Sequence, residues 1–126
     1  MAKNNEMVCD CDMIHDDLVG KAKKRILDKG TINKIAQFLK AFGDETRAKI
    51  INLLEKNELC VCDISVILNM TKSAVSHQLK YLRDMKLIKC RRVSKEVWYS
   101  LADEHVSQVF DISLKHVLER GNGKEI

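Results

Sequence analysis

The sequence predicts a mainly α-helical fold with one small β-hairpin. Apolar residues recur at helical spacing in several segments before residue 86, and residues 87–101 alternate apolar and polar residues on both sides of a short polar turn. The chain has 126 residues, of which 45% are hydrophobic and 32% charged. This length and composition fit a single globular domain with a modest core.

The N-terminal third is predicted to hold a flexible arm and two helices. Residues 1–12 have little periodicity and are expected to form the arm. A helix is expected over residues 13–28, closed by Gly30, and a second over residues 31–42 with Thr31 as N-cap. The apolar stripe of the second helix consists of Ile32, Ile35, Phe38, Leu39 and Phe42.

The next segments predict a helix-turn-helix. Asp44 is expected to cap a helix that stops near Asn57, and residues 59–61 are expected to be extended. A helix then starts at Cys62 or Asp63 and runs to residue 69. Two helices joined by a turn of about three residues, the second of them basic, are typical of a helix-turn-helix. The inward positions of the capped helix are Ala48, Ile51 and Leu53 or Leu54.

The second helix of this pair and the hairpin complete the predicted fold. The helix covers residues 72–86 with Thr71 or Ser73 as N-cap, and the hairpin turns at residues 94–96. A helix-turn-helix followed by a hairpin is a winged helix. The inward positions of the helix over residues 72–86 are Val75, Leu79, Leu82 and Met85. Residues 13–120 are therefore expected to form a winged helix-turn-helix domain, before a frayed tail at 121–126.

Positive charge is concentrated in the predicted helix-turn-helix and hairpin. Residues 72–95 hold eight Lys or Arg and one acidic residue, so they carry +7 of a chain whose net charge is +4. Such a patch favours a polyanion, and double-stranded DNA is the first candidate. The second helix would read base edges in the major groove, and the wing would contact phosphates or the minor groove. The predicted DNA contacts are Ser73, Ser76, His77, Gln78, Lys80, Arg91, Arg92 and Lys95.

Several function classes are disfavoured by composition. No apolar run approaches the roughly 20 residues that span a bilayer, and the N-terminus lacks both a basic start and an apolar core. We therefore expect a cytoplasmic protein with no membrane partner and no small organic substrate. The five cysteines make full disulfide pairing impossible, and no CxxC pair accompanies a βαβ pattern, which argues against a thiol oxidoreductase. Metal binding or thiol chemistry is expected, and no enzyme.

The pair Cys60 and Cys62 is predicted to anchor a metal ion. Inside a helix the two side chains would point about 200° apart, but they converge if Cys60 is extended and Cys62 begins the helix. A helix N-terminus also favours the metal-binding thiolate. With Cys9 and Cys11 of the arm, four thiolates would select cadmium, lead or zinc. The alternative is a pair of small buried hydrophobes. Cys90 is expected to be structural.

The last helix, from Asp103 to about Arg120, is predicted to form a second metal site. His105 and His116 lie on nearly the same helix face but about 16 Å apart along its axis. In two antiparallel copies, Asp103 and His105 of one chain would meet His116 and Glu119 of the other in a site that suits tetrahedral Zn(II). The apolar residues expected to bury this helix are Val106, Val109, Phe110, Ile112, Leu114 and Val117.

The stretches ELCVCDI, SAVSHQLKYLRDMKLI and VWYSLADEH resemble the ArsR/SmtB family of metal-responsive repressors, most closely its cadmium- and lead-sensing members. The resemblance covers residues 32–119. It implies a dimeric repressor that leaves operator DNA when Cd(II), Pb(II) or Zn(II) binds, which derepresses metal resistance or efflux genes. It also implies that the four residues of the last helix hold the zinc of a dimer interface.

The arm departs from those cadmium sensors, which have CxxxC where this chain has CxC. His15 or a three-thiolate geometry would then complete the thiol site. Two other functions are compatible with the same motifs. One is a repressor that responds to arsenite or antimonite, and the other is a DNA-binding regulator whose thiols sense redox state.

Overall fold

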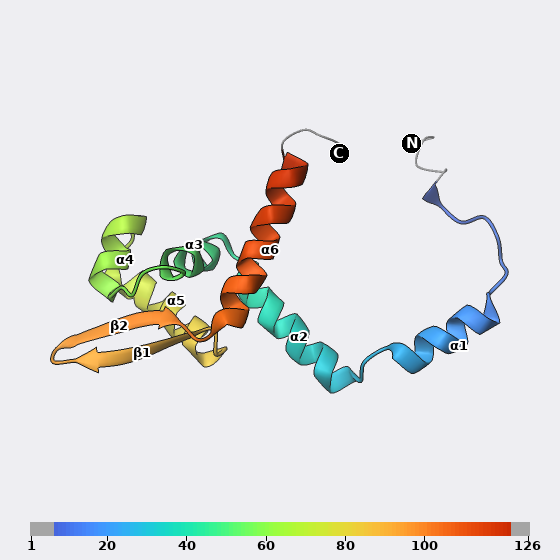
Figure 1. Ribbon diagram of the computed structural model, residues 1–126, viewed down its shortest axis with the longest axis horizontal. Helices are drawn as coiled ribbons and strands as arrows, with labels where there is room; N and C mark the ends of the chain where they lie inside the picture. The colour runs from blue at the N-terminus through green and yellow to red at the C-terminus, as the bar shows by residue number, and fades with distance from the viewer. Residues whose placement is uncertain (1–6, 122–126) are drawn as a thin grey trace. The chain divides into compact units, whose positions relative to one another are not determined.

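The computed structural model describes residues 7–121 (Figure 1). The elements follow in the order α1 (Asp16–Arg25), α2 (Lys29–Phe42), α3 (Glu45–Leu54), α4 (Val61–Leu68), α5 (Lys72–Asp84), β1 (Ile88–Val93), β2 (Glu96–Leu101) and α6 (Glu104–Gly121). The chain divides into two compact units between Asn33 and Lys34. The predicted fold class, helices with one hairpin, is confirmed.

The N-terminal unit contains α1 and the first turn of α2. Helix α1 begins at Asp16 instead of residue 13, and Gly30 lies inside α2 instead of closing α1. The N-cap of α2 is Asp28 and not Thr31. The Thr31 backbone N–H donates to the Asp28 carboxylate at 3.0 Å, and the Thr31 hydroxyl donates to it at 2.8 Å. Asp28 precedes Thr31, and its carboxylate already accepts from the free Thr31 N–H at the helix start. Helix α2 therefore starts earlier than predicted.

The core lies in the second unit, between α3, α4, α5 and the hairpin. Asp44 caps α3 as predicted, with its carboxylate accepting from the Arg47 N–H. Ala48 is only half-buried, whereas Ile50, which the sequence pattern missed, is fully buried. The side chains that are at most 3% exposed are Ala41, Ile50, Ile51, Leu54, Ile64, Val75, Leu79, Leu82, Leu87, Ile88 and Val106.

The apolar stripe predicted for α2 is only partly buried. Phe38 and Phe42 pack against the core with their rings 5.2 Å apart. Ile32, Ile35 and Leu39 are instead 43%, 42% and 50% exposed. A single chain therefore leaves much of this stripe in contact with solvent.

Helices α4 and α5 form the predicted helix-turn-helix. Helix α4 starts at Val61, one or two residues earlier than expected, and ends where Asn69 adopts a left-handed conformation with φ 54°. Thr71 caps α5 by accepting from the Ala74 N–H. Val75, Leu79 and Leu82 are buried as predicted.

The hairpin forms the wing, and it also pairs with the segment before α4. Strands β1 and β2 are antiparallel, and because Val93 pairs with Glu96, the turn contains only Ser94 and Lys95. Leu59 forms an isolated antiparallel bridge with Tyr99 of β2. The base of α4 is thereby hydrogen-bonded to the wing.

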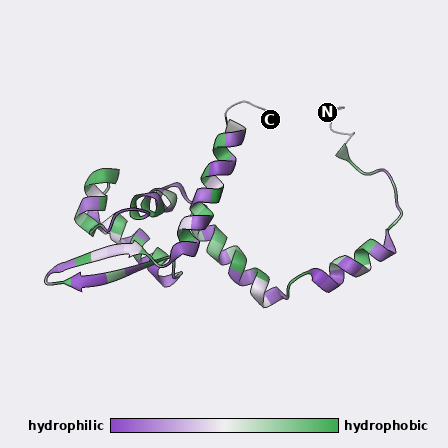
Figure 2. Cartoon of the chain, in the orientation of Figure 1, coloured by the Kyte–Doolittle hydropathy of each residue, from purple (hydrophilic) through white to green (hydrophobic). Residues whose placement is uncertain are grey.

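Helix α6 starts after Asp103, whose carboxylate accepts from the His105 N–H at 2.9 Å. It extends to Gly121, one residue into the predicted tail, and residues 122–126 lie outside the described part of the chain. Val106 is buried, but Ile112 and Val117 are 69% and 61% exposed. Figure 2 shows hydrophobic residues recurring along α6 nearly to its end. No helix within residues 7–121 is long and apolar enough to cross a membrane.

Candidate DNA interface and thiol site

The outer face of α5 presents most of the side chains predicted to read base edges. Ser73, Ser76 and His77 are exposed. Lys80 is exposed as well, and its ammonium group contacts the Asp84 carboxylate at 3.0 Å. The predicted polar face is therefore open to a ligand over the N-terminal half of α5.

Gln78 lies at the edge of this face, half-buried beside α3. Arg47 donates to its side-chain oxygen at 3.5 Å and to the Ala41 carbonyl at 2.9 Å. The guanidinium group also lies 4.3 Å from the centre of the Tyr81 ring. Arg47 thus connects α2, α3 and α5 and orients Gln78.

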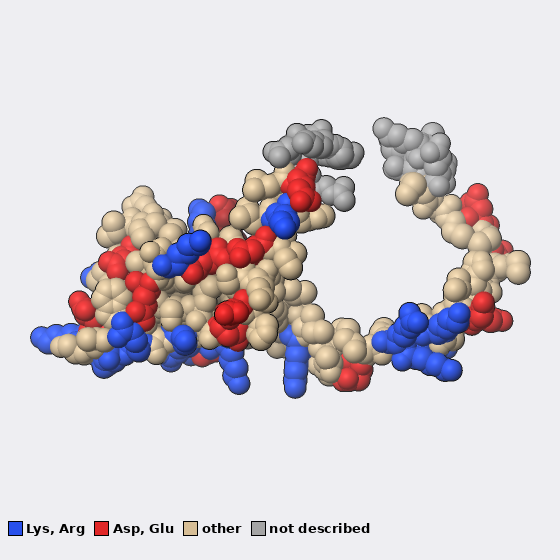
Figure 3. All heavy atoms as spheres, in the orientation of Figure 1, with Lys and Arg blue, Asp and Glu red and all other residues tan. Residues whose placement is uncertain are grey.

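Three cations of the wing were predicted to contact DNA, and they have different surroundings. Figure 3 shows Lys and Arg side chains gathered along the edge of the hairpin. Arg91 donates two hydrogen bonds to the Glu58 carboxylate, at 2.6 and 2.7 Å. This contact lowers the pKa of Glu58 and raises that of Arg91. Arg92 donates to the Ser94 carbonyl at 3.5 Å. Lys95, at the turn, is exposed and pairs with no carboxylate among the described residues.

The central thiols stand at the start of α4, in the arrangement that lets them converge. Cys60 is the extended N-cap, with φ −99° and ψ 173°, and Cys62 lies in the first helical turn. The Cys60 thiol and its backbone N–H donate to the Asp63 carboxylate at 3.3 and 3.1 Å. Cys60 is half-buried and Cys62 is exposed, so neither is a core residue. Cys60 and Cys62 both line one hollow of about 470 Å³.

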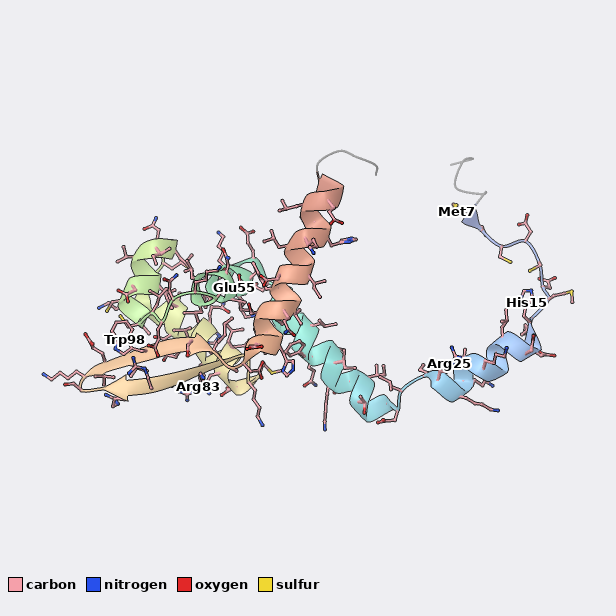
Figure 4. All side chains as sticks on the ribbon, in the orientation of Figure 1. Met7, His15, Arg25, Glu55, Arg83 and Trp98 are labelled. Carbon is pink, nitrogen blue, oxygen red and sulfur yellow. The ribbon has the colours of Figure 1, made fainter. Side chains whose placement is uncertain are left out.

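The arm thiols lie close to each other. The sulfur atoms of Cys9 and Cys11 are 3.0 Å apart and exposed, so the CxC spacing does bring both sulfurs to one place. The hydrogen bond with Cys11 lowers the pKa of the Cys9 thiol. A lowered pKa favours the thiolate, the form that binds metal ions. His15 directly precedes α1 and makes no side-chain capping bond (Figure 4).

The four predicted interface ligands form two separated pairs, one toward each end of α6. The imidazole of His105 lies 3.4 Å from the Asp103 carboxylate at the start of the helix. His116 and Glu119 are exposed near its other end. One chain does not bring the two pairs together, so a site built from all four residues would need a second chain.

Cys90 lies on β1 and contacts the end of α5. Arg83, labelled beside the hairpin in Figure 4, donates to its sulfur at 3.4 Å, and this bond raises the pKa of Arg83. Cys90 is opposite Tyr99 in the hairpin. These contacts hold the wing against α5, which agrees with a structural part for this cysteine.

Comparison with known proteins identifies the family. Residues 44–89 match the family model described as "Bacterial regulatory protein, arsR family". A transcriptional repressor SmtB homologue from Synechocystis is 36% identical over 118 residues, which cover 93% of this chain and 89% of the relative. The chain belongs to the ArsR family of bacterial regulatory proteins.

Two further comparisons concern a second relative and the fold. A cadmium resistance regulatory protein, a CadC homologue from Staphylococcus aureus, is 37% identical over 113 residues, which cover 89% of this chain and 93% of the relative. The structure of a homodimeric winged helix-turn-helix DNA-binding domain from Mycobacterium bovis superposes with a TM-score of 0.67 at 24% identity, covering 79% of this chain and 92% of that one. The protein is thus a transcriptional regulator with a winged helix-turn-helix, and not an enzyme.

The donor atoms of this ArsR-family chain fit a soft or borderline metal ion, but they are arranged in pairs. Thiols occur two by two at the start of α4 and in the arm, and an imidazole–carboxylate pair starts α6. Within the described part of the chain, no three or more His, Cys, Asp and Glu side chains are grouped to hold a metal. A complete tetrahedral shell therefore requires pairs from separate segments or separate chains.

Sequence reasoning missed three residues that organise these sites. Asp63 follows Cys60 by three residues, and this capping-box spacing was a local signal that could have identified it. Arg47 and Glu58 act through partners 31 and 33 residues away in the chain. No local pattern encodes such contacts.

Proposed function

We propose that this ArsR-family regulator is a metal-sensing repressor. As a metal-free homodimer it binds operator DNA, and it leaves the DNA when its thiolates capture Cd(II), Pb(II) or Zn(II). Derepression of metal resistance or efflux genes would follow. The observation that carries this proposal is the pair Cys60 and Cys62, which line one hollow at the start of α4, the first helix of the helix-turn-helix.

The chemistry of the thiol pair supports a soft or borderline ion. Cys60 and Cys62 lie at a helix N-terminus, where Cys60 is half-buried and Cys62 is exposed, so neither is enclosed in the core. Two ligands leave a tetrahedral shell half complete. Cys9 and Cys11, with adjacent sulfurs, supply the two further ligands in this proposal. An all-sulfur donor set selects against Mg(II) and Ca(II), which prefer oxygen.

The second site would form only in the homodimer and would hold Zn(II). Its two nitrogen and two oxygen donors would come from Asp103 and His105 of one chain and His116 and Glu119 of the other. Antiparallel pairing of two α6 helices would also cover Ile112 and Val117, which one chain leaves exposed. Burial of apolar surface is the main driving force for such an interface.

The switch would work by linkage between DNA and metal. The metal-free dimer would place its two α5 helices about one DNA turn, roughly 34 Å, apart. When the thiols release their protons and bind the ion, the dimer would favour a conformation that does not match this spacing. DNA must then weaken metal binding by the same factor, and a coupling of about 3 kcal/mol would change DNA affinity more than a hundredfold.

Fluorescence anisotropy tests the proposal. The probe is a labelled duplex enriched by the metal-free protein from a random-sequence pool. Cd(II), Pb(II) or Zn(II) should weaken binding more than a hundredfold for the wild type, and Cys60→Ser should remain bound with Cd(II). His105→Ala measures whether the α6 site contributes to release.

The rival effectors give different results in the same assay. Release by arsenite but by none of the three metals would establish the arsenic-responsive alternative. Release by peroxide in the presence of chelator would establish a redox sensor. Retention of DNA with every effector would leave a plain DNA-binding module and contradict metal sensing.

A further inference from the structure

The segment that carries the central thiols is attached to the wing by both backbone and side-chain bonds. The Leu59 N–H donates to the Tyr99 carbonyl at 3.1 Å, and the Tyr99 N–H donates to the Leu59 carbonyl at 2.7 Å. One residue earlier, Glu58 accepts the two bonds from Arg91 of β1. The first thiol, on Cys60, therefore follows directly after a stretch that is fixed to both wing strands.

The hollow beside the thiols has one wall from α4 and one from the tip of the wing. The residues that line it are Cys60, Val61, Cys62, Asp63, Lys95, Glu96 and Val97. Its charged members are two carboxylates, Asp63 and Glu96, and a single cation, Lys95. Any additional negative charge in this hollow would therefore act on Lys95 as the only lining group of opposite sign.

Metal capture adds negative charge at this place. Each thiol releases a proton to solvent when it becomes a ligand, so a divalent ion with three thiolates has a net charge of −1 and one with four thiolates has −2. The Lys95 ammonium is attracted to such a complex, and the Glu96 carboxylate is repelled by it. The same lysine is one of the wing cations predicted to contact DNA phosphates.

We propose that Lys95 couples the thiol site to DNA, because the thiolate–metal complex and a DNA phosphate compete for the same ammonium group. This inference rests on the proposed function and names a residue through which that function acts. The neighbouring wing cations are less suited to couple the thiol site to DNA. Arg91 is engaged by Glu58, and Arg92 is not among the residues that line the hollow.

The expected size of the effect follows from the salt dependence of phosphate contacts. One contact changes the slope of log K against log salt by about 0.9, which corresponds to about fivefold in affinity at physiological salt, or about twenty-five-fold for two wings. Lys95 would thus supply part of the total coupling, and the change in dimer conformation would supply the rest.

The test compares Lys95→Met with Arg92→Met as a matched loss of one wing cation. Anisotropy is measured with the enriched duplex, with and without CdCl₂. Lys95→Met should weaken metal-free binding about twenty-five-fold and leave Cd(II)-loaded binding unchanged, so the Cd(II) effect shrinks by that factor. Arg92→Met should weaken both states equally and keep the full Cd(II) effect. Lys95→Arg should behave as the wild type.

A second readout uses the protein without DNA. Competition with a chelator, followed by thiolate-to-cadmium charge-transfer absorption, should show that Lys95→Met binds Cd(II) about fivefold or more weakly. Arg92→Met should bind it as the wild type does. Equal losses of DNA affinity in both states of Lys95→Met, or an unchanged Cd(II) affinity, would overturn the coupling by Lys95. Absence of release by Cd(II), Pb(II) and Zn(II) alike in the wild type would instead overturn the proposed function itself.

Discussion

Ile64 and Val66 are two residues apart on α4 but have opposite surroundings. Ile64 is completely buried against the core, whereas Val66 is 80% exposed. The helix therefore contributes to stability through one face only. Its other face, with the thiol of Cys62, stays available to a ligand.

Replacement of Ile64 with alanine should destabilise the fold. Ile64→Ala removes buried methyl groups and leaves a cavity, so the free energy of unfolding should fall by about 2–5 kcal/mol. Val66→Ala is the matched control on the same helix and should change it by less than about 0.5 kcal/mol. Urea denaturation followed by circular dichroism measures both. Similar losses for the two variants would contradict the assigned burial.

Asp28 should give the start of α2 a pH dependence. The backbone N–H and the hydroxyl of Thr31 hold the pKa of Asp28 below its ordinary value. A carboxylate with a lowered pKa in the folded state stabilises that state above its unfolded pKa of about 3.9, and the stabilisation is lost as pH falls through the folded value. Hydrogen exchange at the Thr31 amide should be faster in Asp28→Ala at pH 5. The difference from wild type should shrink below pH 4, and a constant difference would contradict this origin.

Several of these residue-scale features were predictable from the sequence. Asp44 was identified as a cap, and Thr71 as one of two candidates, because each has a side-chain oxygen directly before an apolar-periodic segment. Asp28 was missed because Thr31, three residues later, is also a common cap. Cys60 was missed because its capping depends on Asp63, and cysteine is not a usual N-cap.

At the scale of elements, α6 combines a buried start with an exposed remainder. Val106 packs into the core, while Ile112 and Val117 are in contact with solvent. Helical spacing alone does not decide which apolar residues of α6 would meet the chain's own core and which would meet a partner, because both need the same spacing. The bridge between Leu59 and β2 was also hidden, since long-range pairing leaves no local pattern.

A charge placed on the exposed face of α6 should separate the proposed dimer. Ile112→Asp would remove two buried side chains per dimer, each worth at least about 1.5 kcal/mol, so the dimer should dissociate over a hundredfold more readily. Analytical ultracentrifugation measures this change. Gln108→Asp, an exposed polar position on the same helix, serves as control. An unchanged dimer in Ile112→Asp would place the interface elsewhere.

At the scale of the whole molecule, charge and sulfur are brought together around the helix-turn-helix. Residues 72–95 carry a net charge of +7, and the two central thiols stand at the start of the preceding helix. The wing is fixed to the thiol segment through Leu59 and Glu58. In the proposed function, ion capture and DNA contact would therefore involve adjoining parts of one unit.

DNA binding by the metal-free protein should depend steeply on salt. If Lys80, Arg92 and Lys95 of each protomer contact phosphates, the six contacts of a dimer give a slope of log K against log salt of about −5. Anisotropy titrations at KCl concentrations from about 50 to about 300 mM measure this slope. A slope near zero would show that the basic patch does not bind DNA.

X-ray absorption spectroscopy of the protein loaded with one equivalent of Cd(II) tests the central claim most directly, because it counts the sulfur atoms bound to the ion. The account predicts three or four sulfur ligands in the wild type and one fewer in both Cys60→Ser and Cys62→Ser. The same number of sulfur ligands in the wild type and in both variants would contradict it.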